Sequence, residues 1–534
     1  MTISTSNEPA AGTTLSRAPA DANADAANAA ANAAAAAAAV TKRRPGGGSR
    51  PSSAAASSSS RAPVAPARTL AGRFALLLVC LAVVFSALAF GTVHAWSLAI
   101  FQAGAGLVVL LWALDAWGTR SLRVSKNVLQ LPLWGLFAVG LFQLLPPARS
   151  LDPYATRMTL VQTAALAVYF AAALAFIDTP RRLRLVVRTL VLFGSLLAVF
   201  GLLQYFLNPA QIYWLRQPQY ALPFGPFVNR HHFAAYMELT IGLPLGLLLG
   251  GAIKRELLVL YVFAVVLMAI ALVATASRGG AVSLGAQLVF AVAVAAFMRA
   301  RSSRGRGGGE EAGGRAQSFF ARAGLQLAFG VALLVGVLIF GGEELIDRTV
   351  GTLSSENITT GRAEFWRGTK EIIRERPLLG AGLGAFGVAY TRHDVSSGAA
   401  RLEQAHNDYL QIFADAGLVG GLLGLVFVAA LFRMAFARMA SHDKFRRGVA
   451  LGALAGCFGT LVHSLFDFSL HLAANALLFL VLAALATTGG GVEEPDSGRR
   501  GGGGRRRRRR SGGSDRSARA GQDSGGGAAG EVAA

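Results

Sequence analysis

The chain has 534 residues, of which 53% are hydrophobic and 15% are charged, against about 25% charged residues in a typical soluble domain. This composition, with a mean hydropathy of +0.47, excludes an ordinary soluble domain and is typical of a polytopic membrane protein. Much of the formal net charge of +22 lies in two terminal segments, so no nucleic-acid partner is predicted. Cys80 and Cys457 both lie in apolar runs, which excludes a disulfide framework and a cysteine-based metal site.

Residues 1–73 form a low-complexity segment rich in Ala, Ser, Asn, Gly and Pro. It has too little apolar surface to compensate for the entropy lost on ordering, so we predict a disordered tail. Because no basic and apolar regions stand at its very start, the first apolar run is expected to remain as a membrane anchor rather than a cleaved signal. Residues 488–534, with arginines at 505–510, are predicted to form a second disordered tail, and contact with anionic lipid or nucleic acid is the alternative.

Between these tails, apolar runs of roughly 20 residues recur, the length that a helix needs to cross a hydrocarbon core of about 30 Å. We therefore predict an all-α membrane domain at residues 74–487, with about twelve transmembrane helices. The expected ranges are 74–93, 95–114, 128–147, 158–177, 184–207, 231–250, 257–276, 280–298, 323–342, 408–432, 449–466 and 470–487.

Basic residues decide the orientation of these helices, because cytoplasmic loops carry an excess of Lys and Arg. With the N-terminal tail in the cytoplasm, the inside loops hold 20 Lys and Arg residues, against five in the short outside loops. Both termini are therefore predicted to be cytoplasmic. The long polar segment at residues 343–407 is predicted to be an extracytoplasmic loop carrying short helices.

Four polar sequences fall at the predicted outer ends of the helices, which makes this face the expected place for chemistry. The first includes Asn229, Arg230 and His232. An Asn can cap a helix and histidines can be interfacial, so a structural and a functional reading are both open. The second is a short break around Arg278. An arginine there can snorkel, but flanking glycines leave backbone N–H groups open to an anion, which favours a functional role.

The third sequence runs from Arg362 through Arg367 to Arg376 with a helical spacing of apolar residues, which indicates an amphipathic helix on or near the membrane. The glycine-rich sequence at 377–386 is superficially similar to a dinucleotide loop. No strand or βαβ unit precedes it, so we reject that interpretation.

The fourth sequence is His406-Asn407-Asp408, which opens the predicted span 408–432. Asn407 or Asp408 can simply cap this helix. Alternatively His406 accepts a proton from an attacking hydroxyl, as histidine side chains can do near neutral pH. Spacing alone leaves both interpretations open.

Taken together, these sequences resemble the O-antigen ligase family of bacterial inner-membrane glycosyltransferases, which also includes O-antigen polymerases and protein O-oligosaccharyltransferases. The matching pieces are residues 227–234, 277–279, 361–362 with Trp366, 377–382, 406–410 and 463–468. They occur in order over about 74–487, with the long outer loop in the expected place. One departure is His231, where the family's Asn-Arg-Asn-His pattern has an Asn, so the later His of the pattern corresponds to His232.

The resemblance implies a GT-C-like helical enzyme that transfers a glycan from an undecaprenyl-diphosphate carrier to an acceptor hydroxyl, without a metal or other cofactor. The acceptor would be lipid A core, a growing glycan or a protein, and membrane lipids would surround the site. The residues it implies as catalytic are Arg278, Arg362 and His406. Those expected to bind substrate are Asn229, Arg230, His232, Arg367, Asn407 and Asp408. Guanidinium groups suit this chemistry because they bind phosphate oxygens bidentately.

The main alternative is a transporter or flippase of lipid-linked glycans. Transporters tend to place ionisable residues near the membrane midplane, often in repeated halves. Here the candidates collect at one face and no repeat stands out, although a pathway lined by Glu238 and Asp467 would favour transport. A non-catalytic scaffold for envelope assembly would account for the topology but not for the outer arginines.

Overall fold

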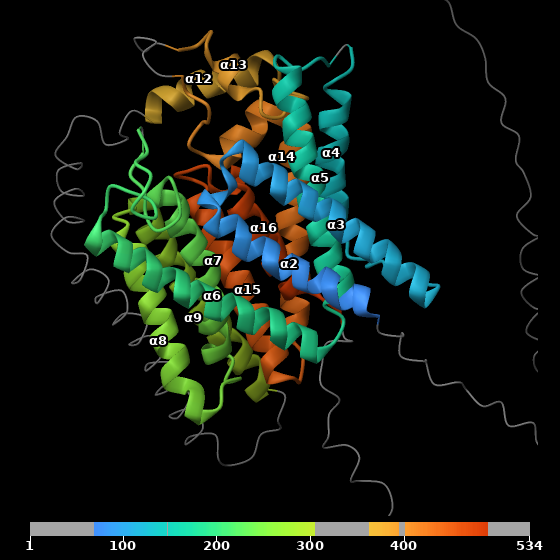
Figure 1. The fold of residues 1–534 in the computed structure, drawn as a ribbon, viewed down its shortest axis with the longest axis vertical. Helices are drawn as coiled ribbons and strands as arrows, with labels where there is room; N and C mark the ends of the chain where they lie inside the picture. The colour runs from blue at the N-terminus through green and yellow to red at the C-terminus, as the bar shows by residue number, and fades with distance from the viewer. Residues whose placement is uncertain (1–68, 147, 220, 305–361, 395–400, 490–534) are drawn as a thin grey trace, which may run out of the picture. The chain divides into compact units, whose positions relative to one another are not determined.

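The computed structural model describes residues 69–146, 148–219, 221–304, 362–394 and 401–489 (Figure 1). Within these ranges the chain is helical and contains no β-strand, which confirms the predicted all-α fold. The predicted span 323–342 and nearly all of both predicted tails lie outside the described residues.

Nine described helices are long and apolar enough to cross a membrane, so the protein is a multi-pass membrane protein. They are α2 (Leu70–Leu88), α3 (Ala95–Thr119), α5 (Pro153–Phe176), α6 (Pro180–Leu207), α7 (Arg230–Leu249), α8 (Arg255–Ala274), α9 (Arg278–Arg304), α14 (Asp408–Met439) and α15 (Lys444–His463). Two shorter apolar helices are α4 (Gln130–Phe142) and α16 (Ala473–Thr487). Each predicted span except 323–342 corresponds to one of these helices.

The observed ends of three helices differ from the predicted ends because of local hydrogen bonds and turns. α2 begins earlier than predicted because the Thr69 hydroxyl accepts a hydrogen bond from the Gly72 N–H (3.0 Å). α4 ends early, at Phe142, where the Gln143 side chain donates to the Leu379 carbonyl (2.6 Å) instead of facing lipid. α16 begins late because Ser469–His471 forms a 3₁₀ turn, η2.

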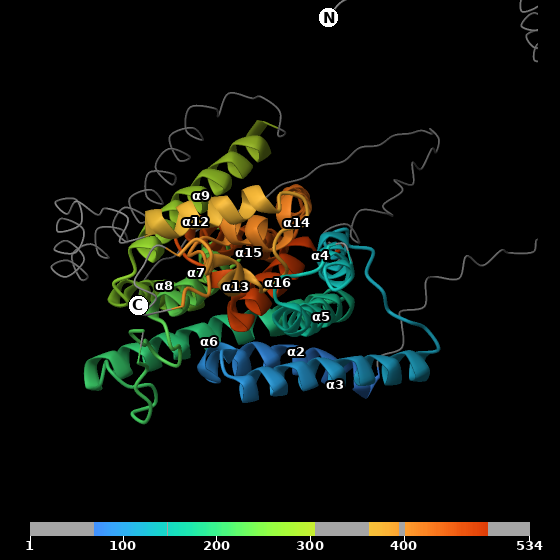
Figure 2. The ribbon, with the colours of Figure 1, turned by 90° about the horizontal axis from the view of Figure 1, so that it is seen from above.

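Two helices outside the bundle lie at the end of the molecule where α14 begins (Figures 1 and 2). They are α12 (Arg362–Glu375) and α13 (Phe386–Tyr390). The predicted amphipathic helix is α12, and its buried Ile372 packs in a small core with Phe386, Tyr390 and Ala414. Much of its apolar stripe is therefore covered by the chain itself.

The glycine-rich sequence between α12 and α13 forms backbone hydrogen bonds with α14 at the point where that helix is kinked. Gly380, Gly382 and Gly384 have positive φ, and so does Gly417 inside α14. Gly382 N–H donates to the carbonyl of Asp415 (3.1 Å), which the helix break leaves available. A Cβ on Gly380 would lie 2.4 Å from the Asp415 backbone, so only glycine fits. These glycines have a structural role, consistent with rejecting a dinucleotide loop.

α7 is the central helix and packs against α15 with direct backbone contact. The contact is made by glycines at four-residue spacing on both helices: Gly242, Gly246 and Gly250 with Gly448, Gly452 and Gly456. A Cβ added to Gly242 would lie 2.4 Å from the Gly452 carbonyl oxygen. Small residues allow this approach, and helix association in lipid depends on such close packing because lipid tails are as apolar as the helices.

We predict that Gly452→Val destabilises the protein, because its Cβ would lie 2.4 Å from the Gly242 carbonyl oxygen. Overpacking of this kind costs about 1–3 kcal/mol, so thermal unfolding in detergent should begin at a lower temperature. The matched control is Gly424→Val in α14, where an added Cβ meets no described atom within 4 Å. Equal unfolding temperatures for the two variants would contradict the prediction.

Candidate active site at converging helix starts

The first residues of α7, α9, α12 and α14 converge on one segment, residues 464–471, which links α15 to α16. A Cβ on Gly279, in the first turn of α9, would lie 3.1 Å from Phe466. Asp408, the first residue of α14, donates its N–H to the Ser464 carbonyl (2.9 Å). Because each helix start carries a partial positive charge, this end of the bundle suits an anion.

Asp467 lies at the centre of this segment, with only 2% of its side chain exposed. Its Oδ1 is 3.3 Å from His406 Nδ1 and its Oδ2 is 3.9 Å from His232 Nε2. Burial alone would raise the pKa of the Asp467 carboxyl, but the hydrogen bond with His406 and the nearby His232 ring hold that pKa below its ordinary value. Asp467 is therefore ionised at neutral pH.

His406 precedes α14 in a left-handed conformation, with φ of 51°, which is uncommon for a residue other than glycine. Its ring stacks on Phe365 of α12 and makes an edge contact with Phe468. The Trp366 indole N–H donates to the carbonyl of Ala405 (3.1 Å), so α12 is fastened to the residue before His406. The imidazole is thus held on both sides and remains 30% exposed.

Arg362 and Arg278 complete the cluster. Burial lowers the pKa of the Arg362 guanidinium, the Asp467 carboxylate opposes this effect, and the positive charge of Arg278 adds to it. The two arginines and Asp467 therefore lie within electrostatic range of one another. Arg278 is the first residue of α9, directly after Ser277, whose hydroxyl accepts from the Gly280 N–H (3.2 Å) and lies 2.8 Å from His231 Nδ1.

The structure thus brings together Arg278, Arg362 and His406, the residues predicted to be catalytic, around Asp467. His232 also belongs to this group, since its ring packs edge-on against Phe468.

The two asparagines predicted to bind substrate both cap the starts of helices. The Asn229 side chain accepts from the His231 N–H (2.9 Å) and caps α7. Asn407 caps α14 by accepting from the N–H groups of Tyr409 and Leu410 (3.0 Å each), and its amide donates to Leu465. These contacts position the site, and contact of either residue with substrate stays a prediction.

Asp408 and Arg230 lie beside the cluster, whereas Arg367 lies near α13. Asp408 is buried and accepts from Ser464 Oγ (2.7 Å), while its second oxygen pairs with His471 Nδ1 (2.7 Å). Arg230, next to His231 at the start of α7, lies within electrostatic range of that ring. Arg367 is exposed near Tyr390 of α13 and, five residues after Arg362, points from a different face of α12.

Several members of the cluster were not among the predicted site residues, Asp467 above all. A second buried pair, His463 Nδ1 and Glu238 Oε1, lies 2.8 Å apart between α15 and α7, with each side chain at most 1% exposed. Ionisable residues inside apolar spans are costly and usually paired or functional, and this sequence signal was available for Glu238 in span 231–250 and His463 in span 449–466. Asp467 falls between two predicted spans and carried no such signal.

A polar cavity of about 440 Å³ opens at the same end of the bundle. It is formed by the loop between α6 and α7, including Arg216, Gln217 and Gln219, together with His94 before α3. Burial and the charge of Arg216 lower the pKa of His94, so this histidine is neutral at physiological pH. The cavity wall includes Val228, which directly precedes Asn229 and Arg230.

Fold and site together define a multi-pass all-α membrane protein with a basic, histidine-containing cluster at one end of its helices. The described residues contain no group of three or more His, Cys, Asp or Glu side chains arranged as a metal site. Residues 263–425 match the family described as O-antigen ligase, which agrees with the resemblance found in the sequence. A comparison with curated proteins finds no match.

The matched segment includes Arg278, Arg362 and His406, whereas Asp467 lies beyond its end. This match supports a ligase or glycosyltransferase type of enzyme with a role in glycan transfer during O-antigen or polysaccharide assembly.

We predict that Asp467→Asn lowers the thermal stability of the protein at neutral pH. Because the pKa of Asp467 is held below its ordinary value of 3.8, the contribution of the carboxylate is complete above that pH. It is lost as the pH falls further, through the lowered pKa. The difference in unfolding temperature between wild type and variant should therefore be large at pH 7 and narrow below about pH 4.

The control for this experiment is Glu364→Gln, which removes an exposed carboxylate from α12. It should change the unfolding temperature little at any pH, because exposed charges contribute little to stability. A wild-type advantage over Asp467→Asn that is the same at pH 7 and pH 3 would contradict the assigned direction of the pKa.

Proposed function

We propose that the protein transfers a glycan from an undecaprenyl-diphosphate carrier to an acceptor hydroxyl at the extracytoplasmic face of the bacterial inner membrane, without a metal ion. The observation that carries the proposal is the arrangement around Asp467. Two arginines that begin separate helices, Arg278 and Arg362, lie beside a histidine that is paired with a buried carboxylate.

The arginines stabilise the leaving group in this proposal. When the bond between the anomeric carbon and the carrier diphosphate breaks, the electron pair leaves with the phosphate oxygen. Arg278 and Arg362 bind this growing charge with guanidinium N–H groups, and the helix starts add their partial positive charges. Groups fixed in place before the reaction stabilise the transition state without further reorganisation, and they supply positive charge that a metal would otherwise provide.

His406 acts on the acceptor in this proposal. The acceptor oxygen attacks the anomeric carbon, and its proton passes to the imidazole of His406. Asp467 holds the ring by the contact at Nδ1 and stabilises the imidazolium that forms. This role requires Asp467 to be ionised while the imidazole accepts the proton, which agrees with the lowered pKa of the carboxyl.

The charge distribution supports the proposed orientation, in which the candidate site is extracytoplasmic and both termini are cytoplasmic. In this arrangement residues 1–73 and 488–534 are cytoplasmic tails of a membrane domain at 74–487, and the segment 343–407 forms an outer loop above it. The start of α9 and the start of α12 lie at the same end, although α9 crosses to the other. The return crossing is the predicted span 323–342, which stays a prediction. The polyprenyl chain would lie in an apolar groove between the helices.

The transporter hypothesis depends on the polar residues Glu238 and Asp467. Glu238 pairs with His463, at the end of α15 that leads into the segment with Asp467. About one helical turn further along α7 lies Gly242, where an added Cβ would be only 2.4 Å from the Gly452 carbonyl oxygen. Among the described residues, the α7–α15 contact is thus too close for a methyl group. This closure favours chemistry at the surface of the bundle over passage along this interface.

We expect Arg278→Ala, Arg362→Ala and His406→Ala each to abolish glycan transfer in cells while leaving the amount of protein in the membrane unchanged. Loss of one preorganised group that stabilises developing charge costs on the order of 10²–10³ in rate. The measurement is the amount of transferred glycan on the acceptor, with membrane levels followed by immunoblot.

The matched control for these variants is Arg374→Ala. Arg374 lies on α12, as Arg362 does, but its side chain is 73% exposed and pairs with Glu371. This variant should transfer glycan normally. Full activity in all three site variants, or equal loss in the control, would overturn the proposed roles.

The type of acceptor can be identified by analysing the glycans of a strain that lacks this protein. We expect glycan to accumulate on the lipid carrier, because its transfer is blocked. Complete polymer on the carrier indicates a ligase, whereas single repeat units indicate a polymerase. Carrier-linked and envelope glycans identical to those of the parent strain would contradict both forms of the proposal.

A further inference from the structure

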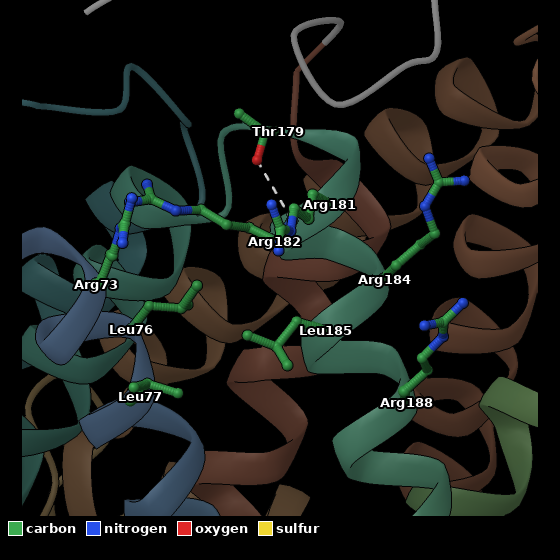
Figure 3. Close-up of a pocket in the computed structure, with 9 residues that line it drawn as sticks. All are labelled: Arg73, Leu76, Leu77, Thr179, Arg181, Arg182, Arg184, Leu185 and Arg188. Atoms are coloured by element: carbon green, nitrogen blue, oxygen red, sulfur yellow. Dashed lines mark hydrogen bonds between the residues drawn. The ribbon is translucent and has the colours of Figure 1, made fainter. Parts of the chain in front are cut away.

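A basic cavity of about 490 Å³ lies between the first turns of α2 and α6, at the opposite end of these helices from the candidate active site (Figure 3). The arginines that line it come from both helices: Arg73, Arg181, Arg182, Arg184 and Arg188. Figure 3 shows Leu76 and Leu77 of α2 and Leu185 of α6 below the guanidinium groups of Arg73 and Arg182. The chemistry proposed above uses none of these residues.

Most of this positive charge is not compensated by the protein. Arg182 pairs with Asp178 (3.0 Å) and Arg184 lies over the ring of Phe445. Arg73, Arg181 and Arg188 are exposed, and no ion pair joins any of them to a carboxylate in the described part of the chain. Guanidinium groups gathered around one space repel each other, so an anion bound between them is favourable.

The apolar part of the cavity indicates what kind of anion fits. Leu77 is 47% exposed and Leu185 is 43% exposed, and both line the cavity with the buried Leu76. A soluble phosphate would leave these side chains in contact with water. A phospholipid would place its phosphate among the arginines and its acyl chains along the leucines, on a helix surface that already faces lipid.

We propose that this cavity binds the headgroup of an anionic phospholipid from the cytoplasmic leaflet, with Arg73, Arg181 and Arg188 as the main phosphate contacts. The charge distribution of the loops assigns this end of the bundle to the cytoplasm. The lipid would join the start of α2 to the start of α6. The proposal concerns binding only and does not depend on the proposed glycan transfer.

The test is lipid binding to the purified full-length chain in detergent, measured by native mass spectrometry during titration with cardiolipin, phosphatidylglycerol or phosphatidylcholine. The wild type should retain the two anionic lipids in preference to phosphatidylcholine. The triple variant Arg73→Gln, Arg181→Gln, Arg188→Gln should bind them at least about tenfold more weakly, since each basic residue near a membrane surface contributes measurably to attraction of anionic lipid.

The matched control removes the same amount of charge from exposed residues at the same end that do not line the cavity: Arg120, Lys254 and Arg255, each changed to Gln. Its lipid binding should stay within about twofold of the wild type, because those residues add only to the general surface potential. An equal loss in control and triple variant would show general charge attraction and overturn the site. Unchanged binding by the triple variant would overturn it as well.

Two further measurements keep the test decisive. Changing Arg73, Arg181 and Arg188 to Lys retains the charge, and this variant should bind lipid with intermediate strength because lysine cannot bind phosphate bidentately. The Lys variant replaces the Gln variant if the Gln variant does not fold. Inorganic phosphate, added at the same concentration as lipid, should not displace the lipid. Displacement by phosphate would indicate a soluble anion site and would contradict the lipid proposal.

Discussion

The direct backbone contact between α7 and α15 is the interaction on which the candidate site depends. Lipid gives helices little hydrophobic reason to associate, so close approach of small residues must hold them together. Gly242 and Gly452 allow this approach, and it sets the start of α7 beside the end of α15. The segment that follows α15 then has to pass over His232, which brings Asp467 to within 3.9 Å of that ring. Bulkier residues at the glycines would separate the two halves of the cluster.

Electrostatics accounts for the composition of the cluster. A carboxylate as buried as Asp467 would be costly without partners, and here His406, His232 and Arg362 lie around it. The convergence of four helix starts adds positive potential at the same place. The cluster is thus richer in positive than in negative charge. That imbalance costs stability and at the same time favours binding of an anion, a compromise common to functional sites.

The sequence predicts the helices well because length and apolar character suffice to identify a membrane span. It predicts their ends less well, since the end of α4 depends on Gln143 bonding to Leu379, 236 residues away. Local rules also anticipated the capping by Asn407. Arg278, Arg362 and His406 were expected from their position and the family resemblance, but the partner of His406 is Asp467, 61 residues later. No local pattern specifies that pairing, because it follows from how α14 and α15 pack.

Arginines lie in groups at both ends of the bundle, and the residues around each group favour a different role for arginine. At the end near α2 and α6, the guanidinium groups of Arg73 and Arg188 have leucines beside them, which suits permanent binding of a lipid headgroup. At the other end, Arg362 lies near Asp467, so part of its charge is already balanced before an anion arrives. That balance weakens binding of the ground state more than binding of a leaving group whose negative charge is growing. An arginine paired in this way is suited to catalysis, because only interactions that strengthen in the transition state accelerate a reaction.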